Sequence, residues 1–201
     1  MIPTHQITGL ILAGGRAQRM GGIDKGLIAF RNKPLIEFAI ARLIDQVGCI
    51  QINANRNLEQ YSAYGYPIVM DETPDFSGPL AGFAAGLREC KTEYLVTVPC
   101  DTPLFPVDLV NRMGGQLIDG NHELIYASSK DAMGKIWAQP VFCLMQKGVA
   151  KSLENFLKSG ERKIDHWFGK LRSTTIVFED EKAFSNVNTP DELSSLEKNS
   201  E

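Results

Sequence analysis

The sequence lacks the features that mark several common classes of protein. No stretch approaches about 18 consecutive apolar residues, so we expect no transmembrane helix. The amino terminus has no basic region followed by an apolar core of signal length, because Gly14 and Gly15 interrupt the nearest candidate. Runs of like charge are absent and the net charge is −3, so we expect neither nucleic acid nor a membrane surface as a partner.

Patterns for metal binding and disulfide formation are also scarce. The four cysteines, Cys49, Cys90, Cys100 and Cys143, are scattered without a C-x-x-C pair, and the three histidines stand apart from one another. This spacing argues against a zinc site and against a disulfide framework. We therefore expect a cytoplasmic protein whose thiols stay reduced.

A glycine-rich loop near the start is the most informative stretch of the chain. The apolar run 7–12 predicts a buried strand, and four glycines and three cations follow it within residues 14–25. Glycine N–H groups approach an anion closely, and arginine and lysine add charge, so the loop favours phosphate binding. It matches neither G-x-G-x-x-G nor the P-loop pattern. The alternative is an ordinary strand-to-helix turn with a solvated basic face.

Short strands alternate with helices along the rest of the chain. This alternation predicts an α/β fold with a mostly parallel, doubly wound sheet flanked by helices. The last helix has a clear start signal, with Thr189 as N-cap, Pro190 in the first turn and Glu192 three residues after the cap. The further predicted strands are 49–53, 67–70, 94–98, 124–127, 141–144 and 174–178, and the further helices begin at Pro34 or cover 79–90, 107–117 and 149–158.

Polar side chains stand at the carboxyl ends of three predicted strands. Asn53, Asp71 and Asp101 would share the edge of the sheet that carries the glycine loop, where ligands bind in open α/β sheets. Asp101 is the clearest metal candidate, because a divalent cation would allow a carboxylate to lie beside phosphate. The alternative for each of the three residues is a turn or helix-cap role.

Five linked motifs resemble those of the molybdenum cofactor guanylyltransferase (MobA) family. They are residues 12–15, residues 19–25, residues 78–82, residues 99–103 and residues 186–190, and they occur in the order of that family. The resemblance covers nearly the whole chain. It implies a three-layer, Rossmann-like fold of the nucleotide-diphospho-sugar transferase type. It also implies one nucleotidyltransferase domain over 1–201, with a nucleotide-binding amino-terminal half and a pterin-binding carboxyl-terminal half.

The same resemblance implies a reaction and a set of site residues. The enzyme would transfer GMP from GTP to molybdopterin and release pyrophosphate, with Mg²⁺ as cofactor and Asp101 as its ligand. The residues implied to bind GTP are Leu12, Ala13, Gly14, Gly15, Lys25, Asn53, Asp71 and Asp101. The residues implied to be catalytic are Lys25, Arg19 and Asp101; those that shape the loops are Gly22, Gly78 and Gly82; those on the pterin side are Asn186, Asn188 and Arg162.

The chemistry follows from the two substrates. An oxygen of the molybdopterin phosphate would attack the α-phosphorus of GTP in line, and because that phosphate is already largely ionised, no strong general base is needed. Lys25 and Arg19 would offset the developing charge. Tyr126, Trp137 and Trp167 could stack on the pterin or serve packing alone. The resemblance also leads us to expect a monomer that meets other cofactor-assembly proteins and the chaperones of target molybdoenzymes.

Three alternatives remain open at this stage. A related cytidylyl- or sugar-phosphate nucleotidyltransferase is one, although the former usually carries Ala-Ala-Gly at 13–15 and the latter a Gly-Thr-Arg-Leu-Pro pattern that is absent here. A non-catalytic adaptor that binds GTP or the cofactor is another, and Lys25 and Asp101 argue against it. A nucleotide-binding domain of unknown role does not explain why the five motifs occur together.

Overall fold

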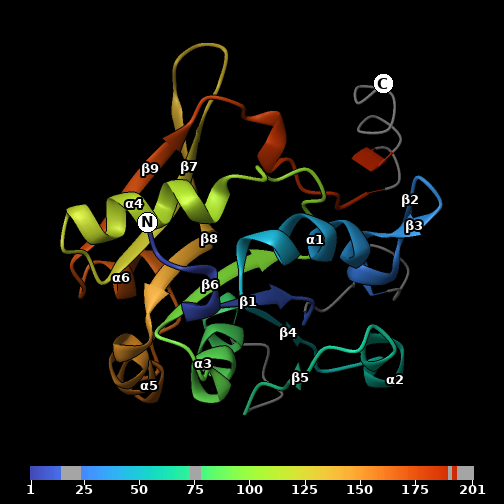
Figure 1. Cartoon of the computed structure of the whole chain (residues 1–201), viewed down its shortest axis with the longest axis horizontal. Helices are drawn as coiled ribbons and strands as arrows, with labels where there is room; N and C mark the ends of the chain where they lie inside the picture. Colours follow the sequence, from blue (N-terminus) through green and yellow to red (C-terminus); the bar gives the residue numbers. More distant parts are fainter. Residues whose placement is uncertain (15–23, 73–77, 190–191, 194–201) are drawn as a thin grey trace.

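The computed structural model describes residues 1–14, 24–72, 78–189 and 192–193, and its centre is a seven-stranded mixed sheet (Figure 1). The neighbouring pairs β5–β4, β4–β1, β1–β6 and β7–β9 are parallel, whereas β8 runs antiparallel to β6 and β7. The predicted mostly parallel sheet is therefore confirmed. In sheet order the strands are β5 (Ile68–Val69), β4 (Cys49–Asn53), β1 (Ile7–Leu12), β6 (Tyr94–Pro99), β8 (Ile136–Gln146), β7 (Leu124–Lys130) and β9 (Ser173–Phe178).

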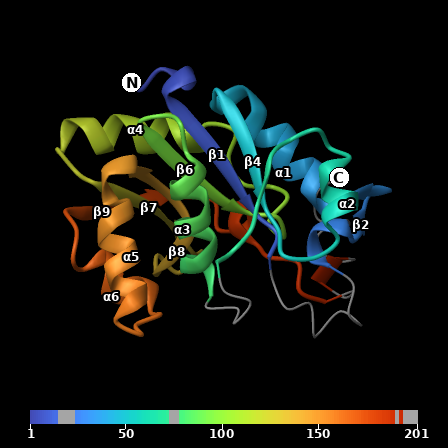
Figure 2. The ribbon, with the colours of Figure 1, turned by 90° about the horizontal axis from the view of Figure 1, so that it is seen from below.

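Helices cover both faces of the sheet, which gives the three layers that the sequence predicts (Figures 1 and 2). On one face, α1 (Leu35–Leu43) and α4 (Leu109–Asp119) bury their apolar sides in a core with β1, β4 and β6. On the other face, α3 (Pro79–Glu89), α5 (Ala150–Lys158) and α6 (Ile164–Phe168) form a second core. Burial of two apolar faces accounts for most of the stabilisation of such a fold.

The smaller elements lie at the periphery of this framework. The helix α2 (Leu58–Ser62) lies beside β5, and a second, two-stranded sheet pairs β2 (Ala29–Phe30) with β3 (Lys33–Pro34). Both α2 and α6 are single turns that the sequence analysis did not predict, because five residues are too few for local propensity to form a helix. The 3₁₀ turns are η1 (Thr4–Gln6), η2 (Lys25–Leu27), η3 (Ile44–Gln46), η4 (Lys147–Val149) and η5 (Lys182–Phe184).

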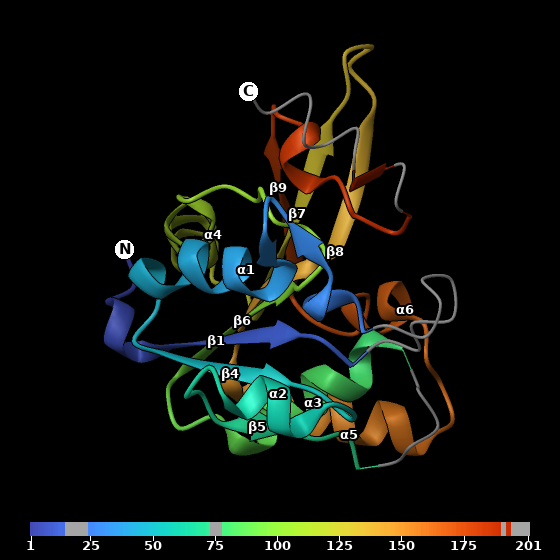
Figure 3. The same cartoon turned by 90° about the vertical axis from the view of Figure 1, so that its right-hand side faces the viewer.

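Three strands differ from the predicted length by more than one residue, and β6 and β9 are each one residue longer than predicted. The pair β7 and β8 extends beyond the predicted 124–127 and 141–144 into a long hairpin that projects from the sheet (Figure 3). Its outer part carries exposed Ile136 and Trp137, so it shows little of the apolar patterning that predicts a strand. The edge strand β5 is shorter than the predicted 67–70. Among the described residues, no helix is long and apolar enough to cross a membrane.

The cap predicted at Thr189 is confirmed by its hydrogen bonds. The Glu192 N–H donates to Thr189 Oγ1 at 3.2 Å, and Glu192 Oε2 accepts from the Asn188 N–H at 2.6 Å. Each bond satisfies a backbone donor at the start of a helix. Pro190 lies outside the described residues.

Candidate active site

The predicted convergence of strand ends is confirmed by the register of the sheet. Leu12 pairs with Asn53 on one side and with Pro99 on the other, so β1, β4 and β6 end together. Backbone bonds continue past the strands, with the Ala13 N–H donating to Asn53 O at 2.8 Å and the Cys100 N–H donating to Leu12 O at 3.1 Å. Leu12 and Ala13 therefore lie at the middle of one edge, with Asn53 at the end of β4 on one side and Asp101 just after β6 on the other.

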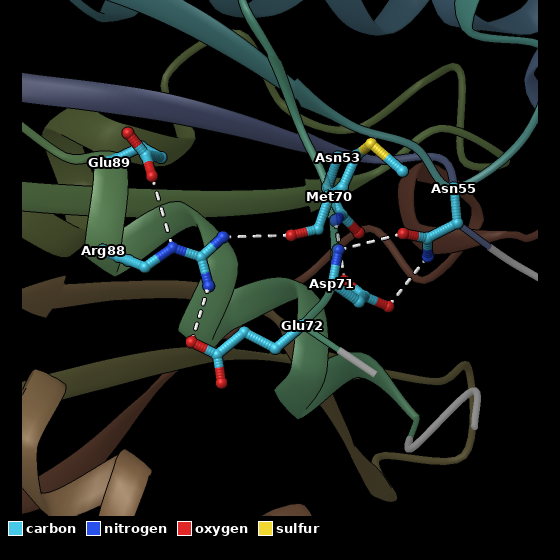
Figure 4. A network of polar contacts seen from close by, with 7 residues as sticks. All are labelled: Asn53, Asn55, Met70, Asp71, Glu72, Arg88 and Glu89. Carbon is cyan, nitrogen blue, oxygen red and sulfur yellow. Dashed lines mark hydrogen bonds and ion pairs between the residues drawn. The ribbon is translucent and has the colours of Figure 1, made fainter. Parts of the chain in front are cut away.

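Asp71 is held by two asparagines at one end of this edge (Figure 4). Its Oδ1 accepts from Asn53 Nδ2 at 2.9 Å, and its Oδ2 accepts from Asn55 Nδ2 at 2.8 Å. The Asp71 N–H also donates to Asn55 Oδ1 at 2.9 Å, and Asn53 Nδ2 reaches Val69 O at 3.2 Å. The carboxylate is thus fixed in one orientation with lone pairs left to accept hydrogen bonds from a ligand.

Glycines 14 and 82 leave the space that Asn53 needs. A Cβ on Gly82 would lie 2.6 Å from both Asn53 Oδ1 and Leu12 Cδ2, and a Cβ on Gly14 would lie 3.2 Å from Asn53 Oδ1. Gly78 serves the backbone instead, because its φ of +76° is a conformation that other residues rarely adopt. Two of these glycines thus make room for Asn53, and the third allows the backbone turn that starts α3.

Lys25 and Asp101 form an ion pair at the end of β6. Lys25 Nζ donates to Asp101 Oδ2 at 2.8 Å, and the two side chains are 26% and 14% exposed. The same ammonium also donates to Asn188 Oδ1. An ammonium and a carboxylate at an accessible sheet edge can contact a phosphate and its metal ion, respectively.

The carboxyl-terminal segment reaches this ion pair through both backbone and side chains. The Val187 N–H donates to Asp101 O at 2.8 Å, and Thr102 Oγ1 donates to Asn186 Oδ1 at 2.5 Å. Asn186 and Asn188 are therefore placed against the residues that follow β6. The sequence alone did not show that Asn186 contacts Thr102 or that Asn188 contacts Lys25, because more than 80 residues separate the partners of each pair.

The sequence analysis gave no role to Asp24, which the structure buries directly beside Lys25. Its side chain is 4% exposed, and burial raises its pKa, opposed by the nearby Tyr61, Arg56 and Asn57. The Asp24 carbonyl accepts from the Leu27 N–H at 3.0 Å and so fixes the turn that presents Lys25. A carboxylate preceding a lysine after a Gly-Gly loop was the available signal.

Asn55 was also missed, although it holds Asp71 as closely as Asn53 does. The pattern Asn-x-Asn, which begins at the last residue of a predicted strand, was visible, but polar residues in that position are common in turns. Gly15, Arg19 and Gly22 lie outside the described residues, so their predicted roles stay predictions.

Arg162 has other hydrogen-bond partners than the two asparagines predicted on the pterin side. Its Nη1 donates to Leu157 O at 2.8 Å and to Glu161 O at 2.7 Å, at the carboxyl end of α5, rather than to Asn186 or Asn188. It lines a cavity of about 440 Å³ between α3 and α5. A guanidinium that satisfies the last carbonyls of a helix has a structural role there.

The three aromatic candidates for pterin stacking have different surroundings. Trp167 is fully buried, with its ring centroid 6.4 Å from that of Phe83, so it belongs to the core. Tyr126 stacks on Phe168 at 5.0 Å between centroids. Trp137 is exposed on the projecting hairpin. Of the three, Trp137 is the most exposed, with Lys135 Nζ 3.6 Å from the centroid of its ring.

The donor set around Asp101 fits Mg²⁺ bound together with a nucleotide. Within the described ranges, no group of three or more His, Cys, Asp or Glu residues is arranged to hold a metal by itself. Mg²⁺ is usually held by one or two carboxylates and completed by substrate phosphates and water. Asp101 supplies one such carboxylate, and Lys25 now occupies its Oδ2.

Comparisons with known proteins agree on one family. Residues 9–174 match the model of the MobA-like NTP transferase domain. The molybdenum cofactor guanylyltransferase of Polynucleobacter asymbioticus is 63% identical over 98% of each chain, and that of Bordetella petrii is 50% identical over 98% of this chain and all of its own. The crystal structure of molybdopterin-guanine dinucleotide biosynthesis protein A from Archaeoglobus fulgidus has the same fold, with a TM-score of 0.77, 21% identity and coverage of 96% of this chain and 98% of its own. The chain that carries these glycines, these asparagines and the Lys25–Asp101 pair on one sheet edge thus belongs to the MobA-like NTP transferases. Within them it belongs to the molybdenum cofactor guanylyltransferases.

Proposed function

We propose that this protein transfers GMP from GTP to molybdenum-molybdopterin, forming molybdopterin guanine dinucleotide and releasing pyrophosphate. The observation that carries this proposal is the pairing of two sites on one sheet edge, the Asn53–Asp71–Asn55 cluster and the Lys25–Asp101 pair. The first has the chemistry to read a base and the second has the chemistry to bind phosphate. The activity named for relatives at 50–63% identity supports the same conclusion.

Base recognition is assigned to Asp71. Guanine presents its N1–H and 2-amino group along one edge, and a carboxylate is the complementary double acceptor. Adenine and cytosine do not offer this pair of adjacent donors. The hydrogen bonds from Asn53 and Asn55 orient the carboxylate before the nucleotide arrives, so less entropy is lost on binding.

Phosphate binding and catalysis are assigned to the centre of the edge. The backbone at Leu12, Ala13, Gly14 and Gly15 would lie along the triphosphate, with Lys25 and Arg19 as its cationic partners. Asp101 would hold Mg²⁺, which neutralises triphosphate charge when bound. Lys25 would then exchange Asp101 for phosphate oxygens, so that its charge offsets that of the α-phosphate and the departing pyrophosphate.

The acceptor substrate is assigned to the carboxyl-terminal half of a single domain. Asn186 and Asn188 would present amide groups to the molybdopterin phosphate beside the α-phosphorus, which would favour in-line attack. Arg162, whose Nη1 alone is engaged with backbone carbonyls, would contact the pterin through the rest of its exposed guanidinium. We further propose that the enzyme works in the cytoplasm as a monomer and passes its product to cofactor-assembly proteins and molybdoenzyme chaperones. The four thiols, all unpaired, support a reducing compartment.

The first test compares thermal stabilisation by GTP, CTP and ATP with Mg²⁺, in the wild type and Asp71→Ala. A ligand that binds the folded state raises its stability by mass action, so base preference is measurable without the labile pterin. We expect selective stabilisation by GTP that Asp71→Ala removes. A preference for CTP would replace the proposal with a cytidylyltransferase. Pyrophosphate release on addition of molybdopterin distinguishes the enzyme from a non-catalytic adaptor.

A further inference from the structure

Arg88 grips the chain on both sides of Asp71 (Figure 4). Its Nη2 donates to Met70 O at 3.1 Å, and its Nη1 donates to Glu72 Oε1 at 3.1 Å. These two acceptors belong to the residues directly before and after Asp71. The planar fork of the guanidinium thus fixes the course of the backbone from which the Asp71 side chain projects.

The segment around Asp71 has little other support from the sheet. It follows β5, an edge strand of two residues that pairs only with β4 in the described part of the chain. The backbone bonds from the Ile52 N–H to Pro67 O and from the Ala54 N–H to Val69 O end before Asp71. Besides the bonds from Asn53 and Asn55, which orient the carboxylate, a contact that ties the neighbouring backbone to a rigid element therefore helps to set where Asp71 lies.

The rigid element that carries Arg88 is α3. Leu80, Phe83 and Leu87 bury one side of this helix. The same helix packs Gly82 against Asn53. The position of Asn53 and the position of the backbone around Asp71 therefore both depend on contacts with α3. Nε of Arg88 donates to Glu89 Oε1 at 3.2 Å, which restricts the side chain on its solvent side.

The contacts of Arg88 are too exposed to contribute much to stability. The Arg88 side chain is 40% exposed and the Glu72 side chain 77% exposed. Surface ion pairs of this kind contribute little to stability, because solvent screens them. A role in placing the Asp71 backbone accounts for the geometry better than a role in holding the fold.

We propose that Arg88 is a positioning residue for base recognition, which sets Asp71 at the distance and angle that guanine requires. The inference rests on the proposed function, because it assumes that Asp71 accepts hydrogen bonds from the base. It assigns to Arg88 a part in selecting the nucleotide without any contact to it. This role requires two donors in the spacing of a guanidinium, so a positive charge alone at position 88 would not replace it fully.

The test measures pyrophosphate release with molybdopterin and either GTP or ITP, which lacks the 2-amino group of guanine. Arg88→Ala should raise KM for GTP and leave kcat nearly unchanged. The ratio of kcat/KM for GTP over ITP should fall about fivefold, the effect of losing one well-aligned hydrogen bond. Arg88→Lys should recover part of the ratio, because an ammonium can still donate to Met70 O.

Arg172→Ala is the matched control. Arg172 directly precedes the opposite edge strand, β9, is 60% exposed, donates to Asn121 O at 3.2 Å and pairs with Glu123. Like Arg88, it contacts one backbone carbonyl and one glutamate, but it lies at the end of the sheet opposite to the strand that precedes Asp71. We expect Arg172→Ala to keep the wild-type ratio, and both alanine variants to unfold within about 2–4 °C of the wild type, since each loses only exposed contacts.

A double variant tests whether Arg88 acts through Asp71. In the Asp71→Ala background, Arg88→Ala should leave the GTP over ITP ratio unchanged, because the carboxylate that it positions is gone. An unchanged ratio in Arg88→Ala alone, an equal fall in Arg172→Ala, or a further fall in the double variant would each overturn the inference while leaving the proposed function intact. A wild type that transfers GMP no better than IMP would overturn the base-reading role of Asp71 and this inference together.

Discussion

Replacing Gly82 by alanine should damage the nucleotide site more than the fold. The new Cβ would lie 2.6 Å from Asn53 Oδ1 and from Leu12 Cδ2. Asn53 cannot move freely, since its Nδ2 is bonded to both Val69 O and Asp71 Oδ1. The substitution therefore forces apart residues at the end of β1 and β4, where the sequence places the ligand.

The magnitude follows from two opposing effects. Overpacking costs about 1–3 kcal/mol. Alanine in a helix is favoured over glycine by about 0.5–1 kcal/mol, which offsets part of that cost. The net loss of about 1 kcal/mol corresponds to a Tm lower by about 2–4 °C. Displacement of Asn53 also frees the Asp71 carboxylate, which weakens its two proposed hydrogen bonds with guanine. Two bonds at about 1 kcal/mol each correspond to more than a factor of 10, so kcat/KM for GTP should fall by more than tenfold.

Two other helical glycines provide the controls. A Cβ on Gly115 in α4 meets nothing within 4 Å, so Gly115→Ala should raise Tm slightly and leave activity unchanged. A Cβ on Gly86 in α3 would lie 2.4 Å from Leu10 Cδ2, in the core and away from Asn53. Gly86→Ala should lower Tm at least as much as Gly82→Ala does. Thermal unfolding and steady-state kinetics on the three variants give the comparison, and equal losses of activity in Gly82→Ala and Gly86→Ala would refute the reasoning.

The remaining predictions concern single polar groups of the site. Lys25→Ala and Asp101→Ala should each lose most of the pyrophosphate release while keeping the wild-type far-UV circular dichroism, and near-normal turnover in either variant would remove its catalytic assignment. Asn55→Ala should raise the Kd for GTP about fivefold through the loss of its bonds to Asp71, measured by calorimetric titration against Asn111→Ala at an exposed position of α4. Burial raises the pKa of Asp24, so its ionised form opposes folding; this cost is present above the folded-state pKa and disappears as pH falls below the ordinary value of 3.8. Asp24→Asn should therefore raise Tm at pH 7 and lose that advantage in acid, and an advantage that is independent of pH in thermal scans would contradict this cause.

The sequence by itself determined the layers of this protein and the edge at which its site lies. The apolar run at Ile7–Leu12 and the helical spacing after Pro34 predict elements whose bounds the structure confirms closely. Strand-end residues such as Asn53 and Asp101 could be assigned to one edge, because parallel strands end together. Local periodicity and topology suffice for such conclusions, since both are encoded in short stretches of the chain.

Contacts between distant segments were decided only by the tertiary structure. The hydrogen bond between Asn188 and Lys25 leaves no signal at short range, and neither do the contacts of Arg88 with both neighbours of Asp71. The contact of Arg162 with Leu157 O in α5 was likewise visible only in the structure, and its predicted place on the pterin side stays a prediction. A side chain's partners depend on packing across the whole fold, and one sequence records which groups are present without recording which of them meet.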